Sequence, residues 1–198
     1  MSSKPSSRKT KLRSADRRAM KQSPRLAKKK LKNRTQTHIR FLTVSAVIAA
    51  LYIGLTYLSF LFGLDKGVVQ VRFSEALCVL AAFTPAAVPG VALGCFLSGL
   101  LTSAHPLDML VGSLASLLGV TGCYLLRFLS RRRLAFCLVP LPNILANAAI
   151  IPWVLSTAYG APEGYIFLFL TVGAGEVISA GVLGSLLLFA LRRRRSLF

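Results

Sequence analysis

The chain has 198 residues, of which 54% are hydrophobic and 16% are charged, and its formal net charge is +19. After residue 40, long apolar runs replace the alternating pattern of a soluble domain, so this is the composition of an integral membrane protein. Fifteen of the 25 basic residues lie in residues 1–40, against one acid there, Asp16. The charge is therefore concentrated in a tail, which argues against a basic nucleic-acid-binding core.

Residues 1–40 are rich in Lys, Arg and Ser and poor in large apolar residues, which is typical of a segment that is disordered when free. We expect a cytoplasmic tail that sets the membrane orientation and contacts anionic lipid headgroups. No aromatic or motif content indicates specific binding of nucleic acid. The basic region and the apolar run after it are both too long for a secretory signal peptide.

Six apolar segments follow within residues 41–191, and a basic tail of residues 192–198 ends the chain. The segments are residues 41–62, 68–83, 86–101, 107–128, 134–156 and 165–191. The first is long enough to cross about 30 Å of hydrocarbon. The second and third are short and are separated by prolines in TPAAVPG, so a helical hairpin that dips in from one side is an alternative for them. We predict an all-α integral membrane protein with six transmembrane helices, of which segments two and three are short.

The basic residues outside the N-terminal tail indicate the orientation of these segments. Clusters follow the fourth segment at residues 131–133 and the sixth at residues 192–195, whereas the other loops hold at most Lys66. Lys and Arg are enriched in cytoplasmic loops. Both the N- and C-termini are therefore expected in the cytoplasm, with the chain a multi-pass protein of the cell membrane.

The first segment carries small residues four positions apart. Ala46 and Ala50 form one such pair, and Ser45 and Ala49 form a second. Small residues at this spacing let another helix approach closely. That helix belongs either to this chain or to an external partner.

Polar side chains occur inside the apolar segments, where a charge costs about 3 kcal/mol or more. They are Gln70, Arg72 and Glu75 in the second segment, Asp108 at the start of the fourth, Asn143 and Asn147 in the fifth below Trp153, and Glu176 in the sixth. From separate segments, these groups can converge on one outward-opening pocket for a flat, polar solute.

Structural roles are the alternatives for the same residues. Arg72 and Glu75 are three positions apart and would share one face of an α-helix, so they can form an internal ion pair. Arg72 can instead pair with Glu176. Asn143 and Asn147 can form interhelical hydrogen bonds.

Enzyme motifs are absent from the sequence. It contains no HExxH, no GxSxG and no Gly-rich phosphate loop that ends in Lys. The two histidines, His38 and His105, lie in the tail and a loop, and the four cysteines lie in apolar runs without metal-ligand spacing. We predict no enzymatic activity, no metal site and no cofactor. If ATP drives transport, another subunit hydrolyses it.

Four stretches of the chain resemble the QueT family of queuosine-precursor transporters. They are QVRFSEALCVLAAFTPAAVPGVALGCFLSGLL at residues 70–101, PLDMLVGSLASLLG at residues 106–119, PNILANAAI at residues 142–150 and GEVISAGVLGSLLL at residues 175–188. The run Q-x-R-x-S-E with the following T-P-A-x-x-P-G is the most specific part. The resemblance covers about residues 41–188 and leaves the basic tail outside.

The resemblance implies a prokaryotic S component, the substrate-binding membrane subunit of an energy-coupling factor (ECF) transporter. Such subunits have six helices and bind substrate near the outer face. They dock through small residues of the first helix, here Ala46 and Ala50, onto a transmembrane coupling subunit driven by two cytoplasmic ATPases. The implied substrate is a deazaguanine base, either the pre-queuosine base or queuine.

The chemistry of such a base suits the polar residues of this chain. Its adjacent N–H donors can pair with one carboxylate, which suits Glu75 or Glu176. Gln70, Asn143 and Asn147 can serve the carbonyl and the other edge atoms. Asp108 can face an aminomethyl cation, and Trp153 or Tyr159 can stack on the ring.

Two other functions stay open at this point. One is a self-sufficient secondary transporter of another small heterocyclic solute, with Glu176 as a proton site. Two related halves would favour it, and the sequence shows no convincing internal repeat. The other is a membrane scaffold whose basic tail recruits anionic partners.

Overall fold

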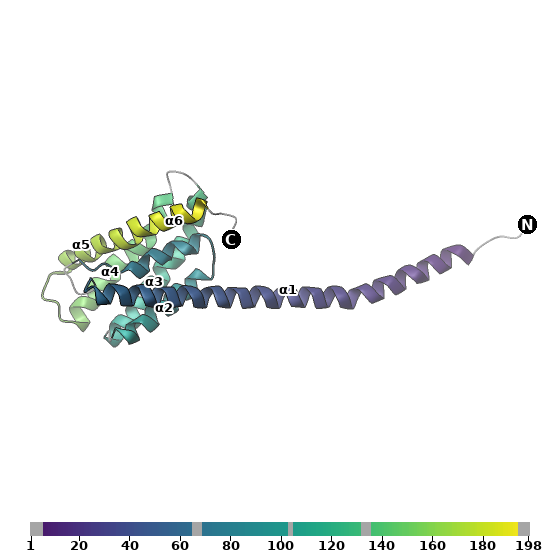
Figure 1. The fold of residues 1–198 in the computed structure, drawn as a ribbon, viewed down its shortest axis with the longest axis horizontal. Coiled ribbons are helices and arrows are strands. Elements are labelled where there is room, and N and C mark those ends of the chain that lie inside the picture. Colours follow the sequence, from purple (N-terminus) through teal and green to yellow (C-terminus); the bar gives the residue numbers. More distant parts are fainter. Residues whose placement is uncertain (1–5, 65–68, 103–104, 132–135, 194–198) are drawn as a thin grey trace, which may run out of the picture. The chain divides into compact units, whose positions relative to one another are not determined.

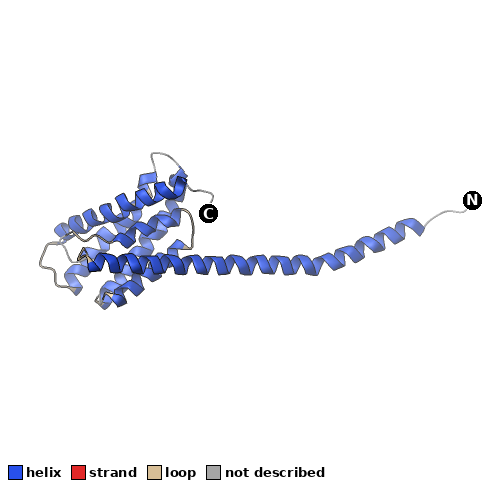
Figure 2. Ribbon diagram, viewed as in Figure 1, coloured by secondary structure: helices blue, strands red, loops and turns tan. Residues whose placement is uncertain are grey.

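The computed structural model describes residues 6–64, 69–102, 105–131 and 136–193. These residues form helices joined by turns, and no strand occurs among them (Figure 2). The chain divides into two units, Met1–Leu42 and Thr43–Phe198. The second unit contains every polar residue predicted to be functional.

Ten helical elements make up the described chain (Figure 1). In order they are α1 (Ser6–Leu61), η1 (Phe73–Ala82), α2 (Ala87–Leu101), α3 (Pro106–Leu125), η2 (Leu126–Arg131), η3 (Phe136–Leu138), α4 (Leu141–Ala158), α5 (Tyr165–Glu176), η4 (Val177–Leu183) and α6 (Gly184–Arg193). Several of them join end to end, so the number of membrane segments is smaller.

Four helical segments are long and apolar enough to cross a membrane. They are Arg34–Leu61, Pro106–Phe128, Leu141–Ala158 and Tyr165–Leu191, and Phe73–Ala82 and Ala87–Leu101 are shorter apolar helices. The predicted all-α class is confirmed, with six apolar helical segments and the second and third shorter than the rest. The crossing of those two short segments and the cytoplasmic location of both termini stay predictions.

The helix α1 begins at Ser6, inside the N-terminal basic segment, and disorder of this segment when free stays a prediction. The predicted boundary near residue 40 lies close to the division of the chain after Leu42. The predicted C-terminal tail, residues 192–198, lies mostly outside the described residues. The roles of both tails stay predictions.

The second segment is a 3-10 helix over Phe73–Ala82, in place of the α-helix predicted over residues 68–83. The reason lies in the residues before it. Arg72 has an extended backbone with φ −112° and ψ 104°. Its N–H donates to Ser179 Oγ at 3.1 Å, and the N–H of Phe73 donates to Ser59 Oγ at 3.0 Å. These N–H groups are therefore occupied by side chains of other segments, and the helix starts late.

The helix η1 lies in the protein core and is too short to span a bilayer alone. A 3-10 helix rises about 2 Å per residue, so ten residues cover about 20 Å of a hydrocarbon core of about 30 Å. Leu77, Cys78 and Val79 of η1 are buried against residues of α1, α2, α3 and α6. This central position places Glu75 deep inside the helix bundle.

The last segment contains a π-helix between two α-helices. It begins at Val177, directly after Glu176, and α5, η4 and α6 together form one continuous helical rod (Figure 1). Stretches of π-helix inside α-helices are frequent at functional sites. The sequence pattern of this segment, which is apolar throughout, does not reveal the change of helix type.

Small residues on the inner face of α1 pack against α2. A Cβ on Gly90 would lie 2.8 Å from the backbone oxygen of Ser45, and one on Gly94 would lie 2.7 Å from the Cβ of Tyr52. Ser45 and Ala49 are accordingly buried, whereas Ala46 and Ala50 are exposed. Of the two small-residue pairs in the first segment, one therefore serves internal packing and the other faces outward.

The surface of α3 is apolar on its outer side. Its exposed leucines recur every three or four residues, at Leu107, Leu110, Leu114 and Leu118. An exposed leucine stripe of this length is typical of a helix face in contact with lipid rather than water.

Candidate functional site

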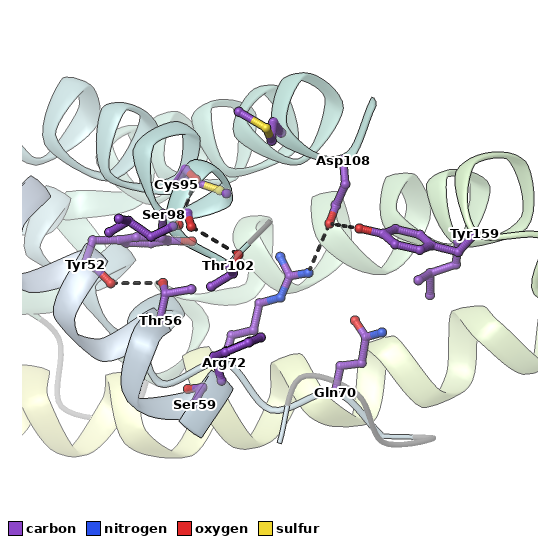
Figure 3. Close-up of a pocket in the computed structure, with 15 residues that line it drawn as sticks. Tyr52, Thr56, Ser59, Gln70, Arg72, Cys95, Ser98, Thr102, Asp108 and Tyr159 are labelled. Atoms are coloured by element: carbon purple, nitrogen blue, oxygen red, sulfur yellow. Dashed lines mark hydrogen bonds and ion pairs between the residues drawn. The ribbon is translucent and has the colours of Figure 1, made fainter. Parts of the chain in front are cut away.

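A cavity of about 590 Å³ lies where α1 and α2 end and α3 begins (Figure 3). Thr56 and Ser59 of α1, Ser98 of α2 and Gln70 and Arg72 of the extended segment are among its lining residues. The loops at this end of the helix bundle contain no cluster of basic residues. If both termini are cytoplasmic, as the sequence predicts, the cavity would face the outside of the cell.

Charged and aromatic side chains form one wall of this cavity. Arg72 Nη2 lies 3.9 Å from Asp108 Oδ2, and the hydroxyl of Tyr159 donates to the same oxygen at 3.1 Å (Figure 3). The Tyr159 oxygen accepts from the backbone N–H of His105 at 3.0 Å. Burial raises the pKa of Tyr159 above its ordinary value, so its hydroxyl keeps the proton that it donates. This arrangement joins the extended segment, α3 and the end of α4.

Hydroxyl groups line the opposite wall of the cavity. Thr56 donates to the backbone oxygen of Tyr52 at 2.9 Å, Ser98 to that of Cys95 at 2.8 Å and Thr102 to that of Ser98 at 3.1 Å (Figure 3). Each hydroxyl proton is therefore used within its own helix. Thr56 Oγ1 also lies 2.8 Å from Ser74 Oγ, so Ser98 and Thr102 offer the lone pairs that can accept hydrogen bonds from a solute.

A second polar cluster lies deeper, around the buried carboxylate of Glu75. Its Oε1 accepts a hydrogen bond from the hydroxyl of Tyr52 and another from Ser116 at 3.3 Å. Its Oε2 accepts from Asn143 Nδ2 at 2.9 Å. The same Asn143 nitrogen lies 3.5 Å from Glu176 Oε2. Tyr52, Glu75, Ser116, Asn143 and Glu176, from five different helical elements, thus form one inner cluster. We include Asn147 in this cluster because it lies one turn further along α4 than Asn143.

Close packing of α3 and α4 positions this inner cluster. A Cβ on Gly119 would lie 2.7 Å from the Cα of Asn143, so only glycine allows this approach. The side chains of Glu75, Asn143, Asn147 and Glu176 are all at most 6% exposed. Because these side chains are shielded from water, each hydrogen bond among them is electrostatically stronger than it would be at the surface.

The cavity and the inner cluster are linked by two residues. Tyr52 and Cys95 both line the cavity. Tyr52 also donates to Glu75, and Ser116 Oγ of the inner cluster lies 3.5 Å from Cys95 Sγ. The inner cluster is therefore in direct contact with residues that line the cavity.

The predicted site residues thus separate into two levels rather than one pocket. Gln70, Arg72 and Asp108 line the cavity, whereas Glu75, Asn143, Asn147 and Glu176 form the inner cluster. Trp153 is 49% exposed and is not among the described residues that line the cavity, whereas Tyr159 is. The functional roles of all these residues stay predictions.

The ion pair of Arg72 differs from both pairings considered from the sequence. Arg72 meets Asp108, and the described residues include no ion pair of Arg72 with Glu75 or Glu176. The i, i+3 spacing of Arg72 and Glu75 would place them together only on an α-helix, and the backbone at Arg72 is extended.

Tyr52, Thr56, Ser98 and Ser116 are site residues that sequence reasoning did not select. A pattern in the sequence could have indicated Tyr52 and Thr56. Ser45, Tyr52, Thr56 and Ser59 recur on one face of the first segment, which is otherwise apolar. Among the described residues, no group of three or more His, Cys, Asp or Glu side chains is arranged to hold a metal ion.

Comparison with known protein families gives one result. The family model described as QueT transporter matches residues 42–193, which is more than half of the chain. No curated protein and no solved structure matches the chain.

Proposed function

Because the chain belongs to the QueT transporter family, we propose that it is the substrate-binding S component of an ECF-type importer for a queuosine precursor. The solute is a deazaguanine base, either the pre-queuosine base or queuine. The observation that carries this proposal is the polar cavity of about 590 Å³ at the end of the helix bundle where α1 and α2 end. Sites for small molecules are commonly clefts of about 300–1,000 Å³.

The groups around the cavity suit a flat heterocycle with a basic substituent. Tyr159 can stack on the ring, and Asp108 can accept hydrogen bonds from an aminomethyl cation. Gln70 offers both a donor and an acceptor for the remaining ring atoms. Arg72 already partly neutralises Asp108, at 3.9 Å, so a bound cation would compete with Arg72 for this carboxylate.

The energy source lies on partner subunits in this proposal. The sequence contains no Gly-rich phosphate loop that ends in Lys. The partners are a transmembrane coupling subunit and two cytoplasmic ATPases, in the cell membrane of a prokaryote. Both tails lie on the cytoplasmic side and contact anionic lipid headgroups there.

The docking surface for the coupling subunit is the outward face of α1. Ala46 and Ala50 are exposed there, and exposed Gly54 follows at the same spacing. No described atom lies within 4 Å of the position that a Cβ of Gly54 would occupy. Three small residues on successive turns let a partner helix approach closely. We refer to Ala46, Ala50 and Gly54 as the docking stripe.

Equilibrium binding to the purified full-length chain tests the substrate. The pre-queuosine base, queuine and guanine are titrated into the detergent-solubilised protein. We expect tight binding of one deazaguanine and weaker binding of guanine, which lacks the substituent that Asp108 would contact. A monodisperse, folded chain that binds none of the three would contradict the proposed substrate.

The buried pair of carboxylates favours one alternative, a secondary transporter with Glu176 as a proton site. Glu75 and Glu176 both approach the amide nitrogen of Asn143, and such groups in membrane proteins often carry protons. Vesicles that contain only this chain distinguish the two functions. Uptake that follows a proton gradient without any ATPase would establish the alternative, and uptake only with the ATP-driven partners would exclude it.

A further inference from the structure

The two glutamates of the inner cluster differ in how many hydrogen bonds they already receive. Glu75 accepts from Tyr52, Ser116 and Asn143, which belong to three different helices. A carboxylate has about four acceptor positions, so that of Glu75 is nearly saturated by the protein. Glu176 receives a single long contact of 3.5 Å, again from Asn143. Glu176 therefore keeps most of its acceptor capacity although it is only 6% exposed.

An amide donor without a partner lies beside this carboxylate. Asn147 is 2% exposed, and its Nδ2 makes no hydrogen bond to any described residue. Its side chain lies close enough to Glu176 to act as a weak donor to that carboxyl group, but outside the geometry of a well-formed hydrogen bond. Leaving a buried N–H group without an acceptor is costly, so such groups in native proteins call for a specific explanation.

The other unpartnered atom of the cluster has a local explanation. Asn143 Oδ1 has no hydrogen-bond partner among the described residues, but it packs against the backbone of Gly119. A Cβ on Gly119 would clash with this oxygen, so the close approach of α3 covers it. The free groups that a solute could reach are thus the carboxylate of Glu176 and the amide nitrogen of Asn147.

A thin apolar layer separates these two groups from the cavity. Ala115, Ile151 and Val172 form a small cluster of their own. Ile151 lies one helical turn outward of Asn147, and Val172 lies one turn outward of Glu176. A solute that enters from the cavity has one layer of side chains to displace.

We propose that Glu176 and Asn147 form an inner subsite for an edge that presents two adjacent N–H donors beside a carbonyl oxygen. The N–H groups donate to Glu176, and Asn147 donates to the carbonyl. Glu75 is a positioning residue that holds Asn143 and Tyr52 in place. This inference rests on the proposed function, because the amino-pyrimidinone edge of a deazaguanine is an edge of that kind.

The spacing of the two levels agrees with a single ligand that contacts both. Asp108 at the cavity and Ser116 in the inner cluster are eight residues apart on α3, or about 12 Å along the helix axis. The edge of a deazaguanine and its substituent lie at opposite ends of the ring system. The edge can therefore reach the inner subsite while the substituent stays near Asp108.

Stability and binding measured together test the subsite. In the empty protein we expect Asn147→Leu and Glu176→Gln to unfold at the same temperature as wild type or a few degrees above it, because they remove a buried donor without a well-formed hydrogen bond and one of two neighbouring buried carboxyl groups. Glu75→Gln should unfold at a lower temperature, because an amide NH2 replaces one of the two oxygens that accept from Tyr52, Ser116 and Asn143. Ser113→Ala on the outer face of α3 is the control and should change neither property.

The same three variants should all bind the deazaguanine more weakly, by about tenfold or more. Wild type should discriminate by about the same factor against a 7-deazahypoxanthine analogue, which lacks the 2-amino donor. A structural role for Asn147 predicts the opposite pattern, namely a destabilised Leu variant that binds as wild type does.

The outcomes separate this inference from the proposed function. Binding that is tight but indifferent to the 2-amino group, or to the loss of Asn147, overturns the inner subsite alone. Failure of the folded wild type to bind any deazaguanine overturns the proposed substrate and the inner subsite together. Weak binding by Asn147→Leu and Glu176→Gln with undiminished stability supports both.

Discussion

At the scale of single residues, Asp108 is the carboxylate that a solute in the cavity can contact directly. Its ion pair with Arg72 is 3.9 Å long and both side chains are partly exposed, so it contributes at most about 1 kcal/mol to folding. We expect Asp108→Asn to unfold much like wild type but to bind the aminomethyl-bearing base about tenfold more weakly. Isothermal titration of that base and of 7-deazaguanine, which lacks the aminomethyl group, measures the difference.

The control for this prediction is Glu163→Gln, which removes an exposed carboxylate from the loop before α5. If both variants weaken binding equally, the effect is one of general charge rather than of contact at Asp108. Equal losses for both ligands in Asp108→Asn would likewise show that the carboxylate does not face the substituent.

Gly119 is the residue whose replacement should damage the inner cluster most directly. A Cβ at this position would lie 2.7 Å from the Cα of Asn143, so Gly119→Ala forces α3 and α4 apart. Overpacking of this kind costs about 1–3 kcal/mol. Thermal unfolding in one detergent should therefore show a lower midpoint for this variant, together with weaker ligand binding.

Gly54→Ala is the matched control, because no described atom lies within 4 Å of its Cβ position. Alanine favours a helix over glycine by up to about 1 kcal/mol, so this variant should be as stable as wild type or more so. A Gly119→Ala variant that unfolds at the wild-type temperature would mean that α3 and α4 are not in the close contact described above.

At the scale of helices, the two faces of α1 make a matched pair of variants possible. Ala49 is buried against α2, whereas Ala50 is exposed on the docking stripe. We expect Ala49→Leu to destabilise the isolated chain by about 1–3 kcal/mol. Ala50→Leu should leave stability and solute binding unchanged but abolish uptake, because a large side chain there keeps a partner helix away.

Solute binding by the isolated chain and ATP-dependent uptake by the assembled transporter check this pair. Uptake at the wild-type rate by Ala50→Leu would place the docking surface elsewhere on the molecule. A loss of solute binding in the same variant would mean that the outer face of α1 also shapes the cavity.

The helices themselves show which features of a fold can be read from sequence. The six apolar segments were predictable because the length of an apolar run is a local property. The late start of η1 was not, because it depends on hydrogen bonds from Arg72 and Phe73 to serines that are far away in the sequence. The π-helix after Glu176 likewise leaves no mark in an apolar run.

At the scale of the whole molecule, the polar residues were predictable but their grouping was not. Gln70, Asp108 and Glu176 stand out because charged and amide groups are rare in apolar segments. Which of them meet depends on how each helix is rotated about its axis and on where it is extended. Because the backbone at Arg72 is extended, its guanidinium lies beside Asp108, whereas Glu75 lies in the inner cluster.

The proposed import direction requires the cavity to face the outside of the cell, and this orientation can be measured. The chain has one exposed cysteine, Cys137, among its four. It lies in η3, in the connection between α3 and α4 that also contains the basic cluster at residues 131–133. We expect a membrane-impermeant thiol reagent to leave Cys137 unlabelled in intact cells and to label it in inverted vesicles, because this connection is cytoplasmic. Glu163→Cys, in the exposed loop at the cavity end, should show the reverse pattern.

The Glu163→Cys variant is best made together with Cys137→Ser, so that each reaction reports a single thiol. The other cysteines are buried and should not react in either preparation. Labelling of Cys137 from outside intact cells would place the cavity on the cytoplasmic side. The cavity would then be a release site rather than a capture site, and the import function proposed for this chain would have to be abandoned.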